Sequence, residues 1–298
     1  MSRLASSPRL LAVALFCVLA PHLHAQVNVT LDIPRLYYLC YEPIVATVTI
    51  SNMTGRDLVL TDNPPDKWFS FEITNADGTP IPPIAADYHL PPLTIPNGET
   101  VKRKVNLLNL YPVTDYGDYH IRAEVYYAAM DKYFQSNPAV ITVSEGQTLW
   151  TQNVGIPDGQ NNAGQFHTFT LLSFRQPKYL MLYVRVVDEN AGKVLATFPL
   201  GSLINGYPPD VAVDSLSQLH ILQMIAPKEY VYTRLSANAD MLGQLDYTDL
   251  KTRPHLRKAA DGDVVISGGI EVLPSTHKDV ENTGPKLSDR PAGVPAAQ

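Results

Sequence analysis

Residues 114–127 read Thr-Asp-Tyr-Gly-Asp-Tyr-His-Ile-Arg-Ala-Glu-Val-Tyr-Tyr, and their pattern indicates the fold class most clearly. From residue 119 onward the side chains alternate between two faces. One face holds Tyr119, Ile121, Ala123, Val125 and Tyr127, and the other holds His120, Arg122, Glu124 and Tyr126. A period of two residues with one apolar face is typical of a half-buried strand in an antiparallel sheet. The stretch therefore predicts an antiparallel β fold.

Similar short runs lie on both sides of this stretch, from residue 26 to about residue 146. Turn sequences such as Asn75-Ala76-Asp77-Gly78 and Asn97-Gly98 separate them. The proline-rich segment 80–96 cannot be a central strand, because proline donates no hydrogen bond to a sheet. About seven or eight strands at this spacing predict a two-sheet sandwich.

The sequence Asp115-x-Gly117-x-Tyr119 opens the alternating run. It resembles the corner that leads into strand F of immunoglobulin-like sandwiches, where a tyrosine hydroxyl bonds back to the main chain. The resemblance implies an immunoglobulin-like or fibronectin-type antiparallel sandwich over residues 26–146. Ile121 and Val48 stand where antibody-type domains have cysteines. The resemblance is therefore to the disulfide-free modules of exported bacterial proteins, which implies adhesion, spacing or accessory binding.

The second half, residues 147–273, contains what looks like a repeat of about 50 residues. A Pro-Lys pair followed by a strand with the pattern Tyr-x-Arg occurs at 177–185 and again at 227–234. An apolar run precedes each copy, and a third, partial copy fits residues 255–267. Repeats of this length resemble propeller blades of three or four strands. The second domain is therefore predicted to be antiparallel β with blade-like repeats, which makes the whole chain all-β.

Several arrangements fit these repeats. A propeller takes about four or more blades to close its ring, and only about two and a half copies fit the second half. Either the copies pack as a small sheet or sandwich, or another chain completes the blades and the protein forms oligomers. A chance likeness among tyrosine-rich strands is the plain alternative.

The two ends of the chain have different compositions from the middle. Residues 1–25 combine Arg3 and Arg9 with an apolar run and a cleavage sequence ending at Ala25, which predicts a signal peptide and export to the periplasm or medium. No other apolar run approaches the ~18–20 residues of a membrane span. Residues 274–298 are rich in Pro, Gly, Ala and charge, which predicts a disordered tail.

Composition limits the partners. The formal net charge is −6 and no long basic run occurs, which argues against a nucleic-acid partner. After removal of residues 1–25, Cys40 is the single cysteine, so no intramolecular disulfide can form. We expect Cys40 to be a small buried apolar residue; a thiol that links two chains is the alternative.

Motifs that carry chemistry are missing from the sequence. There is no Gly-x-Ser-x-Gly, His-Glu-x-x-His, Cys-x-x-Cys or phosphate-binding glycine loop. Asp261-Gly262-Asp263 is better explained as a hairpin turn than as part of a calcium loop, and we predict a structural role for His220. The sequence therefore predicts a protein that binds no metal and no cofactor and is not an enzyme. A carbohydrate-active enzyme, with two carboxylates from distant strands, is the alternative.

Aromatic residues supply the candidate binding surface, since tyrosine and tryptophan suit both protein interfaces and sugar stacking. The chain has 16 tyrosines and two tryptophans. Trp68, Tyr126 and Tyr133 are predicted to point outward, and Tyr88 and His89 lie on the proline-rich segment.

These observations favour an exported, non-catalytic binding or scaffold protein that recognises a protein or a cell-envelope polysaccharide. A carbohydrate-active enzyme or its accessory module is one alternative. A protease inhibitor that uses residues 80–96 is another.

Overall fold

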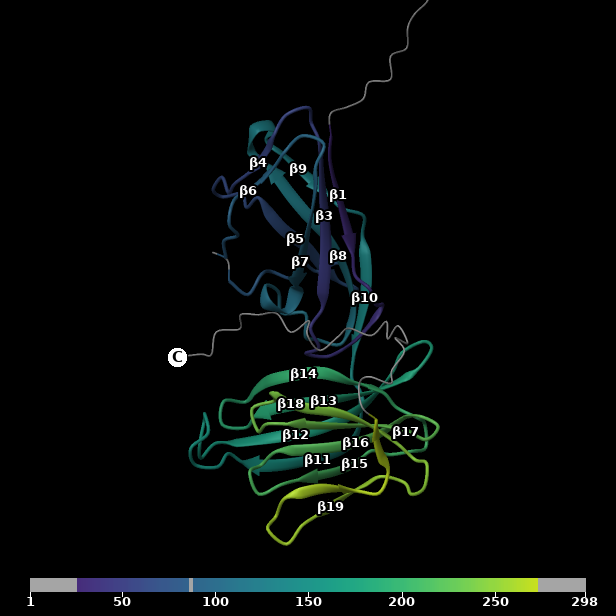
Figure 1. Cartoon of the computed structure of the whole chain (residues 1–298). Helices are drawn as coiled ribbons and strands as arrows, with labels where there is room; N and C mark the ends of the chain where they lie inside the picture. Colours follow the sequence, from purple (N-terminus) through teal and green to yellow (C-terminus); the bar gives the residue numbers. More distant parts are fainter. Residues whose placement is uncertain (1–25, 86–87, 273–298) are drawn as a thin grey trace, which may run out of the picture.

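The structure, a computed structural model, describes residues 26–85 and 88–272 and is built from β-strands (Figure 1). Within these ranges there is no α-helix, and two short 3-10 turns at Leu107–Asn109 and Ala128–Met130 interrupt the strands. The all-β fold predicted from the sequence is confirmed. The predicted signal peptide (1–25) and disordered tail (274–298) lie outside the described residues.

The N-terminal half contains two main sheets around one apolar core. One sheet has the order β1 (Gln26–Asp32), β3 (Val45–Met53), β7 (Thr100–Asn106). The other has the order β2 (Tyr37–Leu39), β10 (Ala139–Ser144), β8 (Gly117–Tyr127), β5 (Phe69–Asn75), and β9 (Lys132–Gln135) also pairs with β8. A short ladder joins β4 (Leu58–Leu60) to β6 (Leu93–Ile95). All pairings are antiparallel except that of β2 with β10.

The stretch quoted above forms β8, at the centre of its sheet. Tyr119, Ile121, Ala123 and Val125 are buried, as the alternation predicted. The Tyr119 hydroxyl donates a hydrogen bond to the carbonyl oxygen of Asp115 at 2.9 Å. This is the contact implied by the resemblance to immunoglobulin-like modules, and it fixes the turn that leads into β8.

The C-terminal half contains two sheets in which the strands follow chain order. The first is β11 (Gln147–Gly155), β12 (Phe166–Arg175), β13 (Leu180–Asp188), β14 (Lys193–Ser202). The second is β15 (Asp210–Val213), β16 (Leu219–Ala226), β17 (Glu229–Leu235), β18 (Met241–Thr248), with β21 (Ile270–Val272) at its edge. Side chains from both sheets form one core, separate from that of the N-terminal half.

The two copies of the repeat occupy equivalent places in these sheets. Arg185 lies on β13 and Arg234 on β17, and each of these is the third strand of its antiparallel run. Because the two runs share a core, they form two packed sheets, one of the arrangements left open by the sequence. The third, partial copy forms a hairpin of β19 (His255–Lys258) and β20 (Val264–Ser267). Its turn contains Asp261-Gly262-Asp263, as predicted.

A connection of two residues joins the two halves, and the halves pack closely against each other around it. Only Glu145 and Gly146 separate β10 from β11, and Figure 1 shows the chain passing there from one stack of strands to the other. A Cβ atom on Gly146 would lie 3.0 Å from Leu39 Cδ1, 3.2 Å from Leu172 Cβ and 3.1 Å from the Ser173 carbonyl oxygen. The two halves are therefore packed together so tightly that only glycine fits without movement.

A buried ion pair of the N-terminal half accepts a side chain from the C-terminal half. Arg35 Nη2 donates to Glu42 Oε1 at 2.6 Å, and the Glu42 side chain is only 2% exposed. The Tyr183 hydroxyl from β13 accepts a hydrogen bond from Arg35 Nη1 at 3.0 Å and donates to Glu42 Oε1 at 3.1 Å. Burial raises the pKa of Glu42, and the charge on Arg35 opposes that rise. Tyr183 thus completes a polar network that neither half contains alone.

Further contacts surround this network, and together they define the junction. Arg185 Nη2 donates to the carbonyl oxygen of Cys40 at 2.7 Å, and Gln176 Nε2 donates to that of Tyr37 at 3.2 Å. Leu39 belongs to an apolar cluster that is otherwise built from the C-terminal half: Leu172, Phe174 and Tyr183. Charged, polar and apolar contacts all cross the junction, so we expect the two halves to move as one body.

Cys40 lies at this junction and is buried, as predicted. Its Sγ donates to the carbonyl oxygen of Thr114 at 2.8 Å, and burial raises the pKa of its thiol. A thiol with a raised pKa and little exposure reacts slowly.

Candidate functional site

The five binding residues predicted from the sequence lie around the loop that precedes β5. His89 Nδ1 is 2.9 Å from Asp62 Oδ2, and the Tyr88 hydroxyl donates to the carbonyl oxygen of Phe69 at 3.0 Å. Trp68 Nε1 donates to the carbonyl oxygen of Leu90 at 3.2 Å. Across the same loop, the Tyr133 hydroxyl donates to Asp66, and the Tyr126 and Tyr133 rings pack at a tilt with centroids 4.8 Å apart.

Two of these residues were wrongly predicted to point outward. Trp68 is 0% exposed, because it precedes β5 and does not continue its alternation. Asp62 accepts a hydrogen bond from the Trp68 backbone N–H, and the indole packs 5.4 Å from Phe69. Tyr126 is 2% exposed, because β9 pairs with the end of β8 and Tyr133, its direct partner in that pairing, packs against its ring. Tyr133 itself is 41% exposed, as predicted.

Most of these side chains hold the proline-rich segment against the sandwich. The Lys67 ammonium donates to the carbonyl oxygen of Tyr88 and lies 4.1 Å from the centre of its ring. We call this set the clasp: Asp62, Lys67, Trp68, Tyr88 and His89. Its polar groups are used in internal contacts, and of its members the His89 side chain, 73% exposed, is the one that presents a large free surface.

We expect the clasp to open in acid. Burial acts to raise the pKa of Asp62, but the hydrogen bonds from His89 and from the Trp68 N–H outweigh it and leave this pKa lowered. Such a carboxyl stabilises the folded state above its unfolded pKa of about 3.9. That stabilisation is lost as the pH falls through the lower, folded pKa.

Pepsin cleavage within residues 80–92, followed by mass spectrometry below about pH 4, measures this opening. Asp62→Asn is the matched control, because it keeps an oxygen acceptor for Trp68 and does not titrate. Cleavage of the wild type should rise relative to Asp62→Asn as the pH falls. Identical pH profiles for the two chains would contradict the role of Asp62.

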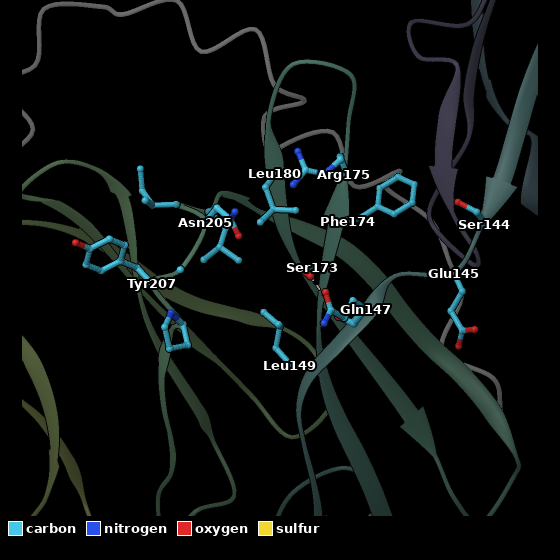
Figure 2. A pocket seen from close by; sticks show the side chains of 14 residues that line it. Ser144, Glu145, Gln147, Leu149, Ser173, Phe174, Arg175, Leu180, Asn205 and Tyr207 are labelled. Carbon is cyan, nitrogen blue, oxygen red and sulfur yellow. Dashed lines mark hydrogen bonds between the residues drawn. The ribbon is translucent and has the colours of Figure 1, made fainter.

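A hollow of about 600 Å³ lies beside the connection between the two halves (Figure 2). We call it the junction hollow. Leu149, Leu180 and Phe174 supply apolar walls, and Ser173 and Asn205 supply polar groups. Figure 2 shows Tyr207 and Glu145 at opposite ends of the view, with Arg175 above Leu180.

Three separate segments position the lining of this hollow. The first is the connection and the start of β11, the second is the end of β12 with the start of β13, and the third is the loop 203–208. The Leu203 N–H donates to the carbonyl oxygen of Leu180 at 2.8 Å, and Tyr207 N–H donates to that of Ile204 at 3.1 Å. These bonds tie the loop to β13 and turn it so that Tyr207 stands 45% exposed at the rim.

A second hollow of about 350 Å³ lies on the other side of Pro208, which lines both. Asp210, Tyr230, Arg253 and His255 contribute to its lining. The Arg253 guanidinium lies 5.9 Å from the ring centres of both Tyr207 and Tyr230. The two hollows therefore follow one another along the C-terminal half.

The charged groups in the hollows do not form a catalytic arrangement. Among the described residues, Glu145 is the one carboxylate lining the first hollow, and Asp210 is the one lining the second. Asp210 Oδ2 accepts a hydrogen bond from the Leu256 N–H at 2.7 Å. Arg175 and Arg253 form no ion pair with any residue in the described ranges, so their charges are open to a ligand.

The buried histidines of the C-terminal half lie away from these hollows. His220 Nδ1 is 2.7 Å from the Tyr232 hydroxyl and its Nε2 is 3.2 Å from Asp214 Oδ2. Burial lowers the pKa of His220. Asp214 also accepts hydrogen bonds from the N–H groups of Leu216 and Gln218, so this set holds a loop in place. Within 26–85 and 88–272, no group of three metal-ligating side chains gathers.

No sequence pattern predicted the junction hollow. Its lining comes from segments up to about 60 residues apart, and its uncharged polar side chains include serine, asparagine and glutamine, which recur throughout the chain. The loop 203–208 could have been noticed only as the connection between the two copies of the repeat.

In the described part of the chain, no helix has the length and apolar character required to cross a bilayer. No protein-family model matches the chain, and no curated protein and no solved structure matches it. Function is therefore inferred from the geometry of the chain itself.

Proposed function

We propose that this chain is an exported, non-catalytic binding protein that holds a segment of a partner protein in the junction hollow. The observation that carries this proposal is the position of the hollow against a fixed junction. The hollow belongs to the C-terminal half and reaches the connection through Ser144 and Glu145, and a site whose walls do not move loses little entropy on binding. The ion pair Arg35–Glu42 and its contact with Tyr183 keep the walls in place.

The chemistry of the hollow suits a peptide segment. Leu149 and Leu180 offer an apolar floor for a side chain, and Asn205 and Ser173 offer polar groups for a main chain. The unpaired Arg175 favours a partner with an acidic residue at this point. A pair of carboxylates, which hydrolysis of a glycosidic bond requires, is not among the lining residues of either hollow.

A polysaccharide is the second candidate, and Tyr207 is the observation that favours it. This tyrosine is exposed at the rim of the junction hollow, where a sugar ring could stack on it. A polysaccharide ligand would depend on Tyr207 more than on Arg175.

Two substitutions in the hollow test the proposal. Asn205→Trp places a large side chain in the junction hollow from an exposed loop position, and Arg175→Glu reverses the charge of the unpaired Arg175. Each change should weaken partner binding by about tenfold or more. Lys102→Glu on β7 is the matched control for the charge reversal, because Lys102 is exposed in the other half. Binding would be measured by calorimetry with the partner recovered from envelope and secreted fractions.

Three outcomes separate the candidates. Loss of a protein partner with both hollow variants, but not with Lys102→Glu, supports the proposal. Retention on envelope polysaccharide that Tyr207→Ala abolishes supports the second candidate. Turnover of any bound material, or equal binding by all the variants, would contradict a non-catalytic site in this hollow.

A further inference from the structure

The edge of the sheet formed by β11 has few of the features that prevent strands from pairing between molecules. One register shift lies between Thr148 and Trp150, and the Ser217 hydroxyl donates to the carbonyl oxygen of Gly155 at the end of the strand. Edge strands present unpaired N–H and C=O groups, and proteins protect them with charge, proline, bulges or covering segments. In the described part of the chain, β11 spans nine residues, Gln-Thr-Leu-Trp-Thr-Gln-Asn-Val-Gly, with no charge and no proline. All of it is exposed except Trp150 and Val154.

The other long edge strands are protected. Lys102, Arg103 and Lys104 make β7 strongly basic. The Asn137 side chain forms hydrogen bonds with both the N–H and the C=O of Leu31. These main-chain groups near the end of β1 are therefore not available to another strand. Residues 79–81 return along β5 and bond its main chain.

On the far side of the β11 sheet, β14 contains Lys193 and Pro199 and has two register shifts against β13. Apart from β18, the remaining edge strands among the described residues have at most four residues. β21 pairs with β18 at residues 246–248, which leaves the uncharged residues 241–245 as a shorter open edge. β11 is therefore the longest uncharged edge among the described strands.

We propose that β11 pairs antiparallel with β11 of a second copy of this chain, around a twofold axis at Gln152. A strand without charge meets its own copy without repulsion, whereas β7 could not. The one register shift of β11 against β12 lies between Thr148 and Trp150. The segment Trp150–Val154 beyond it is regular, and its midpoint is Gln152.

The sequence of this segment is self-complementary in that register. In a symmetric pair, each residue meets the one at equal distance on the other side of the axis. Trp150 then faces Val154, which is a favourable aromatic and β-branched pair, and Thr151 faces Asn153, which is a polar pair. Gln152 faces its own copy. The two four-stranded sheets would join into one sheet, and the dimer would present two junction hollows to a partner.

Introducing a charged side chain at Gln152, where the twofold axis passes, tests this pairing. Gln152 is exposed, forms no side-chain hydrogen bond within the described ranges, and does not line the hollow. Gln152→Lys and Gln152→Glu each place like charges in contact, so each should raise the dimer dissociation constant by about tenfold or more. An equal mixture of the two variants should recover dimer. Sedimentation velocity across a dilution series measures all three samples.

Disulfide trapping tests the register independently. Paired residues lie about 4.5–5.5 Å apart between Cα atoms, within reach of a disulfide. Gln152→Cys should therefore cross-link two chains under mild oxidation. Thr148→Cys, exposed on the same strand, would lie more than about 20 Å from its copy and should not. A wild type that is monomeric throughout, or equal cross-linking at both positions, would overturn the proposal.

Discussion

Replacing Arg35 with methionine should destabilise the protein by about 3–5 kcal/mol, one of the largest effects of any single change. The Glu42 carboxylate would stay buried without its partner, and the Tyr183 hydroxyl would lose its donor. Urea denaturation measures the free energy of unfolding. Arg257→Met, at an exposed position on β19, is the control and should change it by less than about 0.5 kcal/mol.

The pH dependence of this variant has a definite sign. Burial already raises the pKa of Glu42, and removal of Arg35 raises it further. An acid whose pKa is raised in the folded state destabilises that state increasingly as the pH rises through that pKa. Arg35→Met should therefore be least stable at neutral pH and should recover as the pH falls. Adding Glu42→Gln should recover stability at neutral pH, and failure of this second change to help would contradict the ion-pair account.

The two tryptophans report on the two halves separately. Trp68 lies in the N-terminal half and Trp150 in the C-terminal half, and they are the only tryptophans of the chain. Single-tryptophan variants should show one shared unfolding transition when the junction is intact. In Arg35→Met the two transitions should separate, because the network that couples the halves is broken.

Replacing Trp68 with alanine should cost about 3–5 kcal/mol. The indole is fully buried, packs on Phe69 and lies 5.3 Å below the Arg103 guanidinium. Its loss leaves a cavity under the proline-rich segment and removes the bond from Nε1 to Leu90. The cavity and the lost hydrogen bond both destabilise the N-terminal half.

Denaturation and limited proteolysis distinguish the two contributions of Trp68. Trp68→Phe keeps most of the ring volume but not the bond to Leu90, so it should lose less stability while still accelerating cleavage within residues 80–92. If Trp68→Ala loses less than about 1 kcal/mol, the indole is not the packing centre that its burial indicates.

Local patterns were enough to predict the strands. The alternation in residues 114–127 predicted β8 and its buried face, because a period of two is visible in any segment of that length. The same pattern failed at Trp68, which lies one residue before β5 begins, so extending the alternation to it was wrong. It failed at Tyr126 because the cover comes from Tyr133 on a neighbouring strand.

The junction could not be predicted, since its contacts join residues that are distant in sequence. Arg35 and Tyr183 are 148 positions apart, and nothing local marks either as a junction residue. Tyr183 was noticed only as part of the repeat. Its counterpart Tyr232 instead contacts His220, so the repeat predicts the strand but not the role of the residue.

The contacts across the junction should hold the two halves as one rigid body, and a distance distribution between the halves measures this. Nitroxide labels would be placed at Lys104→Cys and Lys193→Cys, which are exposed in different halves, while burial protects Cys40. Labelled chain would be diluted with unlabelled chain to exclude distances between copies. We expect a single narrow distribution that broadens with Tyr183→Phe. A broad distribution in the wild type, unchanged by that variant, would contradict the account.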